Sequence, residues 1–124
     1  MAEGRWGSEH WPTEIRVKRA TRELEIDFDN GVTFTYPAEL LRVESPSAEV
    51  QGHNPTQKTI VAGKRHVGIV EVEPVGHYAV RIRFDDGHST GIYSWAYLYE
   101  MGETRDNLQA AYLGALAAKG LARE

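Results

Sequence analysis

The chain has 124 residues, a net charge of −4 and no cysteine, which fits one domain and excludes disulfides, thiolate zinc sites and iron–sulfur ligation by this chain. Its hydrophobic and charged fractions, 41% and 26%, are ordinary for a globular protein, and no Lys/Arg cluster is dense enough to predict nucleic-acid binding. No apolar run approaches the length of about 18 residues that a membrane span needs, and no basic-then-apolar start resembles a signal peptide, so we expect a cytoplasmic protein that does not bind membranes.

Apolar and polar residues alternate with a period of two in several segments, which predicts β-strands. These segments lie at residues 14–20, 23–28, 32–36, 67–72, 78–84 and from His88 onward. Two turns that contain glycine, Asp29-Asn30-Gly31 and Asp85-Asp86-Gly87, are typical of β-hairpins because glycine tolerates a positive φ. We therefore expect the second turn to bury Phe84 beneath it.

Helical signals lie between and after these strands. They predict a short helix over 38–42 after Pro37, a turn at 47–50 in a long loop, a helix from Ser94-Trp95 and a last helix from Thr104. In the last helix, Leu108, Tyr112 and Leu116 recur at helical spacing, so their stripe is predicted to cover the sheet or to contact another copy. The fold class predicted is α+β with two layers: a mostly antiparallel sheet of about five to six strands, short helices and a C-terminal helix.

Two long motifs make the chain resemble a known family. They are YPAELLRVESPSAEVQGH at residues 36–53 and EPVGHYAVRIRFDDGHSTGIYSWAYLYE at residues 73–100. Together they resemble the DUF971 family, the module similar to the N-terminal domain of γ-butyrobetaine hydroxylase, in its stand-alone bacterial type. The resemblance implies a domain over residues 12–102, preceded by a flexible tail at 1–11 and followed by a helical extension at 103–124.

The resemblance implies a zinc site of the kind expected in the hydroxylase-type relatives, where a CxCxxC cluster and one downstream histidine hold the ion. Laid on this sequence, those positions fall on Ser45, Ser47, Val50 and His88. Serine hydroxyls stay protonated near neutral pH and valine has no donor atom, so the thiolate-type site is absent and no cofactor is expected. We expect the loop from Ser45 to Glu49 still to lie near His88, with hydrogen bonds in place of metal bonds.

A second metal hypothesis remains open. If the loop folds back as the resemblance implies, His53 and His88 could converge with Glu49 or Asp86, a set that suits iron, manganese or zinc. In the alternative interpretation, His88 donates a hydrogen bond to a backbone carbonyl or to Asp85 while His53 pins the loop. Histidines without a supporting HxH or HExxH spacing favour this structural role.

His88 and its surroundings in the sequence also indicate two other roles, catalysis and surface recognition. His88 with Asp86 could transfer protons, but no nucleophile or oxyanion device accompanies them, so we do not expect an enzyme. Aromatic residues gather around the two motifs, and most are expected in the core. Those left exposed beside His88 would form an interaction patch of Asp86, His88, Tyr93 and Trp95.

Three hypotheses for function follow. The first is a non-catalytic interaction or adaptor module for a protein partner or a second copy, acting in iron or iron–sulfur metabolism because the family's domain is also fused to Mrp-type P-loop proteins. The second is a metal-binding domain that uses His53 and His88. The third is an accessory domain to a 2-oxoglutarate oxygenase-type partner, since the oxygenase domain of the larger hydroxylases does not fit within 124 residues.

Overall fold

The computed structural model describes residues 10–52 and 54–124. The strands in this part of the chain are β1 (Pro12–Lys18), β2 (Glu23–Phe28), β3 (Thr33–Pro37), β4 (Ile69–Val75), β5 (Ala79–Phe84) and β6 (Ile92–Ser94). The helices are α1 (Ala38–Val43), α2 (Ala48–Gln51), the 3₁₀ turn η1 (Pro55–Gln57), α3 (Trp95–Glu103) and α4 (Arg105–Ala118). None of these helices is long and apolar enough to cross a membrane.

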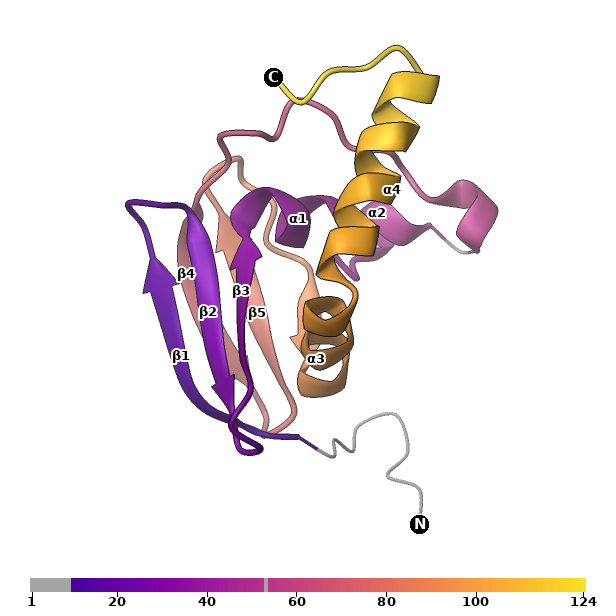
Figure 1. The fold of residues 1–124 in the computed structure, drawn as a ribbon. Helices are drawn as coiled ribbons and strands as arrows, with labels where there is room; N and C mark the ends of the chain where they lie inside the picture. The colour runs from indigo at the N-terminus through magenta and orange to yellow at the C-terminus, as the bar shows by residue number, and fades with distance from the viewer. Residues whose placement is uncertain (1–9, 53) are drawn as a thin grey trace.

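The six strands form two antiparallel sheets of three strands, in the orders β1-β2-β3 and β4-β5-β6. In Figure 1 the first sheet lies in front of β4 and β5, and α3 and α4 stand together on one side of the sheets. The predicted α+β class is therefore confirmed. Each sheet consists of strands that are consecutive in the sequence: β2 pairs with β1 and β3, and β5 pairs with β4 and β6.

The inward faces of β2 and β5 follow the alternation seen in the sequence. Leu24, Ile26 and Phe28 point into the core from β2, and alternate residues of β5 from Val80 to Phe84 do the same. The intervening Arg81 and Arg83 point to solvent, as the period of two requires.

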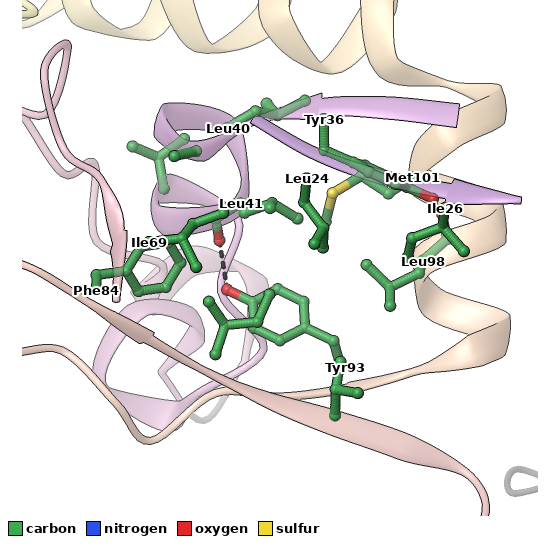
Figure 2. Close-up of a cluster of buried hydrophobic side chains, with 14 of the residues drawn as sticks. Leu24, Ile26, Tyr36, Leu40, Leu41, Ile69, Phe84, Tyr93, Leu98 and Met101 are labelled. Atoms are coloured by element: carbon green, nitrogen blue, oxygen red, sulfur yellow. Dashed lines mark hydrogen bonds between the residues drawn. The ribbon is translucent and has the colours of Figure 1, made fainter. Parts of the chain in front are cut away.

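The core lies where these inward faces meet α1 and α3, and Figure 2 shows its side chains converging from all of these elements. Two tyrosines connect the sheets to the helices while burying their rings. The hydroxyl of Tyr36 donates to the Leu98 carbonyl at 2.7 Å, and that of Tyr93 donates to the Leu41 carbonyl at 2.5 Å. Their buried hydroxyls are thus satisfied, as buried polar groups generally must be.

The C-terminal segment packs on the domain through α4. Tyr112 and Leu116 are buried, and the Tyr112 hydroxyl donates to the Val61 carbonyl at 2.6 Å. Beyond the helix, Arg123 donates two hydrogen bonds to the buried carboxylate of Glu39. This segment is consequently attached to the body of the domain by both apolar contacts and an ion pair.

Several element boundaries differ from the sequence prediction; the strand predicted at 14–20, for example, runs from Pro12 to Lys18. The strand predicted at 67–72 runs from Ile69 to Val75 and includes Pro74, which β4 tolerates because it is an edge strand. The return strand predicted from His88 begins only at Ile92. Residues 88–91 bind a different part of the chain, described below.

The predicted tail covers residues 1–11, of which 1–9 lie outside the described residues. His10 stacks on Tyr99 with ring centroids 4.1 Å apart, and the Trp11 carbonyl accepts a hydrogen bond from the Asp29 amide at 2.8 Å. Residues 10 and 11 are therefore held against the domain.

Candidate functional site

His88 is positioned by the hairpin turn that follows β5. Gly87 has a φ of 94°, and the Phe84 amide donates to the His88 carbonyl at 2.9 Å. The Asp86 carboxylate accepts from the His88 amide at 3.0 Å and closes the turn from the side. The predicted turn and the burial of Phe84 are confirmed. The turn directs the imidazole of His88 inward, so that only 3% of this side chain is exposed.

The loop between α1 and α2 lies against this histidine, as predicted. Ser45 Oγ lies 2.9 Å from His88 Nε2, and Glu49 Oε1 lies 3.0 Å from His88 Nδ1. One residue further along each segment, the hydroxyls of Ser47 and Thr90 are 2.7 Å apart. These contacts occupy residues 88–91, which explains why the return strand starts late.

The donor and acceptor of each hydrogen bond in this cluster follow from one another. Glu49 accepts from Nδ1 of His88, so Nε2 accepts from the Ser45 hydroxyl, and Ser45 Oγ in turn accepts from the Ser47 amide at 3.3 Å. Burial lowers the pKa of His88, and the charge of Arg42 lowers it further, while Glu49 opposes the shift. The imidazole is thus neutral near pH 7.

An ion cluster lies on the other side of His88. Arg42 Nε and Lys64 Nζ each lie 2.7 Å from Asp86 Oδ2. Although burial opposes ionisation, the hydrogen bonds from Lys64, the His88 amide and Arg42 lower the pKa of Asp86 to about 2. Asp86 is therefore an ionised anchor for α1 and the turn, which makes it unsuited to accept protons near neutral pH.

The order Glu49–His88–Ser45 matches the relay of a serine hydrolase, in which an acid orients a histidine that activates a hydroxyl. Burial distinguishes this cluster from such a relay. Ser45 is completely buried, and a side chain at position 91 would meet Ser45 Oγ, Tyr93 and Pro46. Among the described residues, the hydroxyl is therefore enclosed, and its hydrogen bonds link the two motifs to each other.

The comparisons with known proteins agree with this placement of the motifs. The family model described as gamma-butyrobetaine hydroxylase-like, N-terminal, matches residues 15–99. The chain belongs to this family. A crystal structure of a DUF971-family protein of unknown function from Acidithiobacillus ferrooxidans ATCC 23270 is 46% identical, with a TM-score of 0.63 over 73% of this chain and 91% of that one.

Two NMR solution structures of proteins extend the similarity over most of the chain. One is 45% identical with a TM-score of 0.83, covering all of this chain and 91% of the other. The second is 44% identical with a TM-score of 0.81, covering 94% and 92%. No curated protein matches the chain. The similarity thus establishes a hydroxylase-like N-terminal domain and leaves its activity to be argued from the structure.

The zinc site implied by the resemblance does not fit this hydroxylase-like N-terminal domain. Ser45 and Ser47 use their hydroxyls in hydrogen bonds, and the buried Val50 offers no donor atom. Within residues 10–52 and 54–124, no three His, Cys, Asp or Glu side chains are grouped so that they could hold a metal ion. His53 lies outside the described residues, so its pairing with His88 stays a prediction.

The aromatic members of the predicted interaction patch lie in the core. Tyr93 is completely buried, and Trp95 is buried with its indole N–H donating to the His77 carbonyl at 2.8 Å. The alternation of β6 explains this, because it turns Tyr93 inward and leaves Ile92 outside. With His88 also enclosed, Asp86 and these three residues do not form an accessible surface.

Two accessible cavities lie along α4, which begins after the family match ends. A cavity of about 230 Å³ separates α4 from residues 58–61, and one of about 240 Å³ separates it from α3. Both are lined by Glu44 and Leu108. The helical spacing in the sequence predicted the buried stripe of α4. It carries no signal for these cavities, since they depend on where the long loop returns.

Proposed function

We propose that this domain is a non-catalytic interaction module and that α4 is its contact surface. The single observation that carries the proposal is the composition of α4 on the side that faces solvent. No charged residue lies between Asp106 and Lys119, although about half of the positions between them are exposed. An ordinary surface helix places charged residues on its outer face.

From Ala110 to Ala118, the exposed residues of α4 are apolar as well as uncharged. Leu113 is 38% exposed in the middle of the helix, and Leu121 is 42% exposed just beyond its end. Figure 1 shows α4 rising from α3 along the outside of the domain, where a second molecule can reach it. Contiguous apolar surface of this kind marks interaction sites on soluble domains.

The enclosed His88 cluster supports the non-catalytic part of the proposal. Its hydroxyl, imidazole and carboxylate bind one another, and burial separates the serine from substrates. The finer hypotheses, a role in iron or iron–sulfur metabolism or beside an oxygenase-type partner, rest on the family resemblance. Identification of the molecule bound at α4 would decide between them.

Site-specific photo-crosslinking in the native cell tests this function. A crosslinking amino acid at Leu113 should give covalent adducts, whether with another copy or with a different protein. The matched control places the same amino acid at Ile92, which is 41% exposed on β6 and distant in sequence. If position 113 gives no adduct, or if both positions give the same adducts, α4 is not a contact surface and the proposal fails.

A further inference from the structure

We propose that the outer edge of β3 is a site for strand addition, and that the segment before His10, residues 1–9 of the same chain, adds to it as an antiparallel strand. The site involves neither Leu113 nor Leu121, so it goes beyond the proposed function. Figure 1 shows β3 at the edge of its sheet, on the side that faces α3 and α4. An edge strand leaves part of its backbone hydrogen-bonding groups without a neighbouring strand.

The register between β2 and β3 decides which backbone groups face this edge. In an antiparallel pair, residues that exchange hydrogen bonds alternate with residues that do not. The Phe28 amide donates to the Val32 carbonyl at 2.8 Å, so two residues further along β3 the backbone of Phe34 also bonds to β2. Thr33 and Thr35 therefore direct their amides and carbonyls away from β2. Among the described residues, none accepts a hydrogen bond from either of these two amides.

A cavity of about 520 Å³ lies beside these backbone groups, between residues 33–35 and residues 102–107. Arg105 spans it, since its Nη1 donates to the Thr35 carbonyl at 2.8 Å, and this bond confirms that the carbonyl faces the cavity. A residue of an added strand needs a rise of about 3.4 Å, a strand spacing of about 4.8 Å and a layer of about 10 Å, so the cavity has room for about three residues.

The edge of β3 lacks the features with which proteins usually block an exposed strand. Charged side chains and prolines are the common ones. β4, an edge strand of the other sheet, has them in Glu71, Glu73 and Pro74, whereas residues 33–36 of β3 include neither. The described residues thus leave this edge available for pairing, apart from the one carbonyl that Arg105 occupies.

The place where the described chain begins identifies the occupant. His10 stacks on Tyr99 with ring centroids 4.1 Å apart, and Tyr99 in turn contacts Phe34 edge-on with centroids 5.2 Å apart. Phe34 is the middle one of the three β3 residues that line the cavity. The chain therefore enters the described fold beside the cavity, and the covalent connection gives the preceding segment a high effective concentration there.

Direction and length also fit this segment. The Trp11 carbonyl accepts from the Asp29 amide, in the turn before β3, so a chain that runs towards His10 runs antiparallel to β3. Nine residues precede His10 and none is proline, so their amides can donate to a neighbouring strand. They span up to about 30 Å when extended, whereas three paired residues need about 10 Å. Residues 7–9, the nearest three, consequently pair with β3.

Amide hydrogen exchange of the full chain, measured for each residue by NMR, tests this pairing. The amides of Thr33 and Thr35 should exchange at least about tenfold more slowly in the wild type than in variants whose segment cannot pair. The Phe34 amide, which faces β2, is the internal control and should stay protected in every variant. Exchange of Thr33 and Thr35 at the rate of unprotected amides in the wild type would overturn the proposal.

A proline scan distinguishes an added strand from loose packing. Gly7→Pro, Ser8→Pro and Glu9→Pro each remove one amide donor. Alternate amides of a strand face its neighbour, so protection of the β3 amides should be lost either in Ser8→Pro alone or in both other variants. Ala2→Pro, beyond the length of the cavity, is the matched control and should exchange like the wild type. Loss in all three variants, or in none, would contradict the added strand.

The protection should be the same at protein concentrations between about 50 µM and about 1 mM, because pairing within one chain does not depend on concentration. Protection that increases with concentration would assign the strand to a second copy and overturn the pairing within one chain. The crosslinking experiment at Leu113 concerns a different surface. The function proposed for α4 and the strand proposed at β3 can therefore fail independently.

Discussion

Replacing His88 by alanine should lower the free energy of unfolding by about 2–4 kcal/mol and leave the domain folded. The imidazole is almost fully buried and spans the hydrogen bonds to Ser45 and Glu49. The bond to Ser45 is buried and contributes about 1 kcal/mol. The bond to Glu49 contributes less, because 64% of the Glu49 side chain is exposed and the interaction is screened. The cavity left by the ring accounts for the remainder.

Thermal and urea denaturation would measure this loss, which corresponds to a decrease in melting temperature of about 10 °C for a domain of this size. His66→Ala is the matched control, since 66% of the His66 side chain is exposed and its removal should leave the melting temperature unchanged. A loss below about 1 kcal/mol for His88→Ala would mean that the cluster does not hold the two motifs together.

Three other measurements test the same region. Burial, and next the charge of Arg42, lower the pKa of His88, so the unfolded chain takes up this proton first. Stability should therefore fall as the pH drops through about 6.5 and level off below the folded pKa, and His88→Gln should remove this component. Gly87→Val should cost about 1–3 kcal/mol in thermal denaturation because Gly87 has a φ of 94°; a melting temperature equal to that of the wild type would exclude the turn geometry. EDTA should leave the melting temperature of the wild type unchanged, and unfolding that zinc or iron reverses would instead make the histidines a metal site.

Local features were predictable from the sequence because local chemistry determines them. A glycine after two aspartates specifies the turn at Gly87, and a period of two specifies which residues of β2 and β5 point inward. The approach of Ser45 to His88 was predicted from the family resemblance, and the structure confirms it. That contact joins residues 43 positions apart, so no local pattern could have indicated it.

Other features depend on pairings that a local pattern does not encode. Alternation assigns a face to each strand but not a neighbour, so it predicted a sheet of about five to six strands but not the division into two sheets of three. The same limit affected the predicted patch, since Tyr93 and Trp95 were identified by residue type and their burial depends on the helix and sheet that cover them. Glu49 accepts a hydrogen bond from His88, whereas the sequence indicated it only as a metal ligand.

The local geometry at Gly91 indicates how this chain holds the loop without the thiolates that the family resemblance implied. Ser45 Oγ lies so close to the Gly91 backbone that any side chain at position 91 would collide with it. The loop can therefore approach only because both positions carry small residues, and the gap is filled by hydrogen bonds from Ser45 to His88 and from Ser47 to Thr90. Such bonds hold the segments together and engage the hydroxyls of Ser45, Ser47 and Thr90. These hydrogen bonds thus stabilise the two motifs from within, and interaction with other molecules is expected on the outer face of α4 instead.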